Sequence, residues 1–253
     1  KDLTDVDKLT VGLRYDKFEK GLQRTKTFTL PKAPQPEDFS SLSPSIEWTR
    51  KFSDQLEGVA RFSYVEKPGG FSAFTDDDAQ LKFSEEEMNA YEIGFHYKPS
   101  DTWGLNVTAY LNEIENYQFE MPVLGTTDYY VANADEVTAK GLEIEGYFVP
   151  AADWTLSALY GLCDTEYDEF ASLAALKGKQ VSFVPDHTLS LSLSYADEDG
   201  VFGQLGSRTI GETHYWDNTG ANSGDVIDTY TLLDARIGIQ RQDWEISVFA
   251  TNL

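Results

Sequence analysis

Histidine and cysteine are the side chains that most readily do acid–base, nucleophilic or metal chemistry near neutral pH, and this chain has three histidines and one cysteine. His187 follows Asp186 directly and Ser190 comes three residues later, so the three groups of a Ser–His–Asp hydrolase lie close together in the sequence. The sequence around them alternates like a strand, and adjacent strand residues face opposite ways. We therefore expect no catalytic triad, no enzyme activity and no cofactor, and we expect Cys163 to be inert.

Acidic residues form several short clusters, and carboxylates are ligands that divalent cations favour. The clusters lie at 76–78, 85–87, 164–169 and 197–199, and the formal net charge is −23. No cluster has the spacing of a calcium loop, so the sequence predicts solvated loop charge and no metal site, with divalent-ion binding by these loops as the alternative. A charge of this sign also argues against nucleic acid as a partner, because a polyanion would be repelled.

Aromatic residues and one histidine lie in long segments between the predicted strands, where side chains are free to meet a ligand. Packing of these rings on one another is the alternative interpretation. The candidate ligand-binding residues are Tyr117, Tyr129, Tyr130, His214, Tyr215 and Trp216.

Apolar and polar residues alternate along most of the chain, as they do in strands with two different faces. Leu189, Leu191 and Leu193, for example, alternate with Ser190 and Ser192. Eleven strands are expected, at about 8–18, 43–52, 57–66, 86–98, 103–116, 138–149, 154–166, 186–196, 200–212, 228–240 and 244–253.

Short and long connections between these strands alternate strictly. Tight turns are expected at 53–56, 99–102, 150–153, 197–199 and 241–243, and long loops at 19–42, 67–85, 117–137, 167–185 and 213–227. All tight turns then lie at one end of the sheet, as in outer-membrane barrels. A mean hydropathy of −0.41 is compatible with this, because only alternate residues of a barrel strand meet lipid.

Aromatic residues recur beside the tight turns, on the same strand face as the apolar set. Such rings form an interfacial belt in membrane proteins. They are Tyr97, Trp103, Phe148, Trp154, Tyr195 and Trp244. The sequence therefore predicts an all-β protein, an antiparallel transmembrane β-barrel of the bacterial outer membrane, in contact with the lipid bilayer.

The two faces of each strand are assigned by this alternation. We expect the polar set to face the lumen, toward a ligand or toward another domain inside the barrel: Arg14, Glu92, Glu143, Glu145, Ser192 and Arg236. We expect the apolar set to face lipid: Leu9, Val11, Leu13, Ile93, Phe95, Leu105, Val107, Leu142, Ile144, Leu191, Ile237 and Val248.

An odd number of antiparallel strands cannot close without a parallel seam, and lipid does not tolerate open sheet edges. We therefore expect an arc of about 11 strands within a larger barrel, and no pairing between 8–18 and 244–253.

Several segments, in consistent order, resemble the C-terminal half of the barrel of TonB-dependent outer-membrane receptors. The similar segments are Tyr64-Val-Glu-Lys-Pro-Gly-Gly-Phe71, Tyr91-Glu-Ile-Gly94, Ala132-Asn-Ala-Asp-Glu-Val-Thr-Ala-Lys-Gly-Leu-Glu-Ile-Glu145 and Val248-Phe-Ala-Thr-Asn-Leu253. The resemblance implies a barrel of about 22 strands, a plug domain, and energised uptake of a scarce ligand such as a metal–siderophore chelate or a carbohydrate. Residues 1–253 would be the C-terminal portion of that barrel, without the plug, the remaining strands or the part that meets the TonB energy-coupling protein.

The long acidic loops support a second hypothesis from another class. The chain would then be a soluble extracellular β-sheet module with an adhesive or structural role. Dependence on detergent during purification distinguishes the two, because only the barrel exposes its leucine face.

Overall fold

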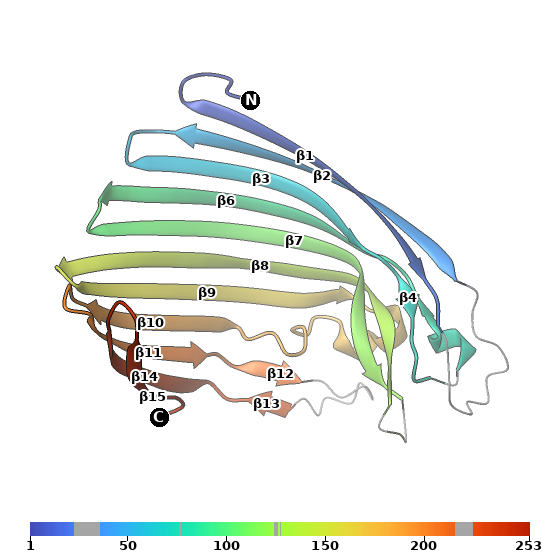
Figure 1. Cartoon of the computed structure of the whole chain (residues 1–253). Coiled ribbons are helices and arrows are strands. Elements are labelled where there is room, and N and C mark those ends of the chain that lie inside the picture. The colour runs from blue at the N-terminus through green and yellow to red at the C-terminus, as the bar shows by residue number, and fades with distance from the viewer. Residues whose placement is uncertain (23–35, 76, 124–125, 127, 216–224) are drawn as a thin grey trace.

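The computed structural model describes residues 1–22, 36–75, 77–123, 126, 128–215 and 225–253. Eleven antiparallel strands form one sheet in which each strand pairs with its neighbours in chain order (Figure 1). They are β1 (Asp7–Lys20), β2 (Glu37–Lys51), β3 (Leu56–Lys67), β6 (Glu86–Ser100), β7 (Trp103–Pro122), β8 (Tyr129–Ala151), β9 (Trp154–Glu169), β10 (His187–Ala196), β11 (Val201–Ile210), β14 (Tyr230–Gln240) and β15 (Glu245–Ala250). The predicted number of strands and their order are confirmed.

Small elements fill the connections at the long-loop end. These are the strand pairs β4 (Gly70–Phe71) with β5 (Lys82–Phe83) and β12 (Thr213–Tyr215) with β13 (Asp225–Ile227), and the 3-10 segments η1 (Asp78–Gln80) and η2 (Ala171–Leu176). In the part of the chain that the structure describes, no helix is long and apolar enough to cross a membrane.

The sheet is an arc with β1 at one edge and β15 at the other. Strands 8–18 and 244–253 therefore do not pair within the described ranges, as the odd strand number predicts. Residues at the start of the chain lie along the edge of β1, where Leu9 N–H donates to the Lys1 carbonyl over 2.9 Å.

The outer face of the sheet is apolar and exposed. Val11 and Val248 are both 71% exposed, and Leu13 and Ile237 are 70% and 65% exposed. A continuous apolar face of this kind must be shielded from water, and in a transmembrane barrel the lipid bilayer shields it. These four residues belong to the apolar set that the alternation assigns to lipid.

The apolar band has the height of a bilayer core. On β7 it runs from Trp103 to Leu111, and Leu111 pairs with Lys140 on β8. Lys140 lies on the outer face, where its Nζ is 3.1 Å from Oδ2 of Asp164 on β9, which marks the end of the band. About nine tilted residues suffice to cross the hydrocarbon core, so β7, β8 and β9 extend beyond it at the long-loop end.

Aromatic rings meet across the strand ends at the tight turns. The ring centroids of Trp154 and Tyr195 lie 4.9 Å apart, and those of Tyr97 and Trp103 lie 5.3 Å apart. Four of the six predicted belt residues thus form ring pairs that join neighbouring strands.

Residues 117–137, expected to form a long loop, are instead mainly strand. β7 continues to Pro122 and β8 begins at Tyr129, with an unbroken register between them. These parts of the strands lie above the membrane, where no face has to be apolar. Apolar and polar residues therefore do not alternate in them, and the sequence shows no strand pattern. In the same way β2 begins at Glu37, within the segment 19–42 that was expected to be a loop.

An apolar cluster covers the inner face of β7–β9 at the long-loop end. Tyr167 and Phe170 are 0% and 1% exposed, and Leu176 and Val181 of the following segment are each 3% exposed. Val181 N–H donates to Oγ1 of Thr165, an inner-face residue of β9, over 3.1 Å. The connection from β9 to β10 is therefore packed against the inside of the sheet.

Candidate functional site

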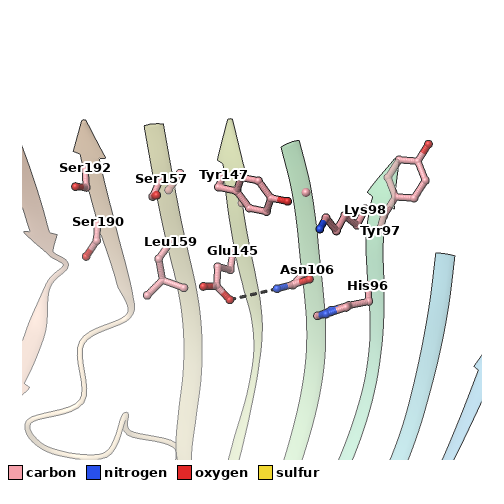
Figure 2. A pocket seen from close by; sticks show the side chains of 13 residues that line it. His96, Tyr97, Lys98, Asn106, Glu145, Tyr147, Ser157, Leu159, Ser190 and Ser192 are labelled. Atoms are coloured by element: carbon pink, nitrogen blue, oxygen red, sulfur yellow. Dashed lines mark hydrogen bonds between the residues drawn. The ribbon is translucent and has the colours of Figure 1, made fainter. Parts of the chain in front are cut away.

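The inner face carries a hollow of about 270 Å³ near the tight-turn end, lined by polar and apolar side chains (Figure 2). Its lining comes from five neighbouring strands, β6 to β10, which is possible because the sheet is concave on this side. The polar side chains around it are His96, Lys98, Asn106, Glu145, Tyr147, Ser157, Ser190 and Ser192.

Each predicted lumenal residue lies on this inner face and has a polar neighbour. Glu145 accepts a hydrogen bond of 3.3 Å from Asn106 Nδ2, and Glu92 lies 3.9 Å from Arg61. Arg236 pairs with Glu245 and lies 5.1 Å from the ring of Phe202. Arg14 pairs with Asp16 over 2.7 Å, and Glu143 lies opposite Thr108.

The arrangement suits recognition of a polar surface rather than a reaction. Hydroxyl groups of β9 and β10 lie on one side of the hollow, and Lys98 of β6 lies on the other, beyond Glu145 of β8 and Asn106 of β7 (Figure 2). Lys98 Nζ lies 2.9 Å from Asp101 Oδ1. Such groups exchange water for hydrogen bonds with a polypeptide or a hydrophilic solute at little net cost. No group of three or more His, Cys, Asp or Glu side chains within the described ranges could hold a metal ion.

The first group of candidate loop aromatics lies on the β7–β8 hairpin. Tyr129 is 46% exposed and contacts Phe74 with ring centroids 5.6 Å apart. Tyr117 packs against the inner apolar cluster, and burial raises its pKa. Burial and the neighbouring Asp77 carboxylate raise the pKa of Tyr130. Of these three rings, Tyr129 is the one most available to a ligand.

The second group lies on β12. His214 Nε2 is 3.2 Å from Glu212 Oε1, and the Tyr215 ring lies 5.1 Å from the ring of Phe183. Trp216 lies outside the described residues. Among the described side chains, no ring contact joins this group to the β7–β8 hairpin. The structure thus separates the five described candidates into two places on the rim.

The Asp186–His187 pair differs from expectation in one respect. His187 Nδ1 lies 2.8 Å from Asp186 Oδ1, although the two were expected to point to opposite faces. The reason is that β10 begins at His187, so Asp186 lies in a bend where strand alternation does not hold. The His187 ring faces outward beside Tyr160, whereas Ser190 lines the inner hollow, and no triad forms.

Two exposed aromatics of the rim, Phe74 and Phe183, were not among the sequence candidates. Phe183 is 63% exposed with φ of 65°, a left-handed conformation that bulky residues rarely adopt. Neither lies in a periodic segment, so no pattern of alternation points to them. His96 and Lys98, by contrast, lie two and three alternations after Glu92 on the same strand face, so the alternation that assigns Glu92 to the inner face assigns them to it as well.

A family model described as "TonB dependent receptor-like, beta-barrel" matches residues 2–253. A curated relative, the ferrichrome outer membrane transporter/phage receptor of Escherichia coli K12, is 26% identical over 160 residues, which are 61% of this chain and 20% of that protein.

Solved structures show the same fold. The ferric yersiniabactin uptake receptor FyuA of Yersinia pestis aligns with 99% of this chain at a TM-score of 0.78 and 20% identity. The copper transporter OprC aligns with 99% of it at a TM-score of 0.75 and 14% identity. The chain spans 38% and 39% of these two structures.

Proposed function

Because the chain belongs to the family of TonB-dependent receptor-like β-barrels, we propose that it is part of a receptor for energised uptake of a metal chelate. Family members are outer-membrane receptors and transporters, which agrees with the predicted location and with the prediction that the chain is not an enzyme. The match over residues 2–253 carries the proposal.

The proposed ligand class follows from the relatives. Two of those named above are described as taking ferrichrome and ferric yersiniabactin, and the third as transporting copper. A metal is therefore the shared cargo, and a chelate is its form in two of the three. A carbohydrate ligand finds no support among them. The soluble module finds none either, because its apolar face would have to be buried against protein.

The proposed partners are a plug domain, the remaining barrel strands and the TonB protein. Residues 1–253 would be the C-terminal portion of the barrel domain. Glu143 and Glu145 lie on the inner face, where a plug would meet them. Further strands would pair with the edge of β15 and with the edge of β1 beyond Leu9, where the first residues of the chain no longer cover it. Tyr129 and Tyr215 are the rim residues proposed to meet the chelate, since both expose their rings.

The experiment uses the complete receptor in cells that lack it. Uptake of radioactive iron is measured with a hydroxamate, a catecholate and a phenolate chelate, with and without an uncoupler of the proton gradient. We expect uptake of at least one chelate that depends on the receptor and stops with the uncoupler. Receptor-independent or uncoupler-insensitive uptake of all three, with copper chelates also untransported, would overturn the proposal.

A further inference from the structure

The side-chain amide of Gln118 joins the two ends of the connection between β3 and β6. Nε2 of Gln118, on β7, donates to the Pro68 carbonyl and to the Ser84 carbonyl, both over 3.1 Å. Pro68 begins this connection and Ser84 lies one residue before its end. Lys20 Nζ adds a bond of 2.8 Å to the carbonyl of Gly69.

Asn133 on β8 holds the same end of the connection. Its Oδ1 accepts from Ser84 N–H over 2.8 Å, and its Nδ2 donates to the Ser84 carbonyl over 3.2 Å and to the Asn116 carbonyl over 2.6 Å. The side-chain amide therefore pairs with Ser84 as a strand backbone would. All three bonds are consistent with one assignment of the oxygen and nitrogen atoms of the Asn133 amide.

The connection is also ordered internally and packed on the hairpin. Ser72 N–H donates to the Leu81 carbonyl over 2.8 Å, and Oγ of Ser72 accepts from Val131 N–H of β8 over 3.0 Å. Thr75 is 1% exposed. A Cβ on Gly69 would lie 2.6 Å from the Phe83 carbonyl oxygen, so the backbone passes there only without a side chain.

We propose that this connection is a fixed part of the outer mouth, locked to the β7–β8 hairpin by Gln118 and Asn133. We name residues 68–75, 77–85, 116–122 and 129–135 together the rim lobe. Phe74 comes from one half of the lobe and Tyr129 from the other, and their rings touch at the surface. The lock therefore sets this exposed ring pair before any ligand arrives. The sequence segments around Gly69-Gly70 and Asn133-Ala134, far apart in the chain, are two halves of one structural unit.

The test is hydrogen–deuterium exchange on the complete receptor in detergent, without ligand. In the wild type, peptides within 70–75 and 77–84 should exchange slowly, like the barrel strands. Asn133→Ala should raise their exchange rate by about tenfold or more, because it removes three bonds at once. Asn133→Asp should raise the exchange rate at least as much, since it loses both donations and places a carboxylate oxygen against the carbonyl oxygens of Ser84 and Asn116.

Asn106→Ala is the matched control, because Asn106 also lies on the β7–β8 pair and its side chain, among the residues that the structure describes, bonds only that of Glu145. It should leave the exchange of the rim lobe unchanged. If Asn133→Ala prevents folding, Gln118→Ala supplies the same comparison. Fast exchange of 70–84 in the wild type would show a mobile lid and overturn the proposal. Equal exchange in the wild type and in a folded Asn133→Ala or Gln118→Ala variant would also overturn it.

Discussion

The ring of Tyr110 on β7 occupies the space that a side chain at Gly141 on β8 would need. A Cβ on Gly141 would lie 2.6 Å from Cζ of Tyr110 and closer still to the Leu162 carbonyl oxygen. A glycine in the Lys140-Gly-Leu142 run thus lets an inner-face tyrosine lie against the sheet.

Gly141→Ala should lower the free energy of unfolding by about 1–3 kcal/mol, because the backbone of β9 cannot move away. Denaturant unfolding of the complete receptor in vesicles measures this. Gly146→Ala on the same strand is the control, since its Cβ would meet nothing closer than 3.4 Å and should cost less than about 0.5 kcal/mol. Equal effects of the two variants would contradict this account.

Leu191→Arg should lower the free energy of unfolding by ~2–4 kcal/mol, because Leu191 faces outward at the middle of β10, close to the midplane of the bilayer. Ser192→Arg places the same charge on the inner face beside the hollow and should be tolerated. Folding yields and urea midpoints in vesicles compare the two. The opposite order would show that the faces are inverted.

The Trp154–Tyr195 ring pair should couple β9 to β10 at the membrane interface. A double-mutant cycle of Trp154→Ala and Tyr195→Ala is expected to give a coupling of about 0.5–1.5 kcal/mol, the usual value for such ring pairs. Trp154 and Tyr97 do not touch, so their cycle should give less than about 0.5 kcal/mol. A coupling near zero for the first pair would mean that the belt acts only through lipid.

Burial raises the pKa of Tyr167 to about 12, from its ordinary value of 10.0. Between pH 10 and 12 the Tyr167 phenol therefore stays protonated in the folded protein, whereas in the unfolded chain it loses its proton near pH 10. Stability should therefore be unaffected by this group below pH 10 and should fall between about pH 10 and 12.

Tyrosinate absorbance checks this titration. The difference between wild type and Tyr167→Phe should show a group that titrates near pH 12 in the folded receptor and near pH 10 in guanidinium. Titration of that group near pH 10 in the folded protein would mean that water reaches the inner apolar cluster.

The sequence alone determined the number of strands, their faces, the alternation of short and long connections and the aromatic belt. Each of these is local: side-chain direction repeats every two residues, and a turn is recognised by its own few residues. The arc also followed from the sequence, since eleven antiparallel strands cannot close by themselves.

Only the tertiary structure decided what happens beyond the membrane. Asn116, with φ of 54°, interrupts the alternation of β7, so that Ile114 before it and Tyr117 after it join one cluster. The cluster forms because Val181, far along the chain, packs against the same surface. The bond between Asn133 and Ser84 spans 49 residues. Above the bilayer no lipid imposes an apolar face, so contacts between distant residues rather than a local period determine which segments become strand and which side chains meet.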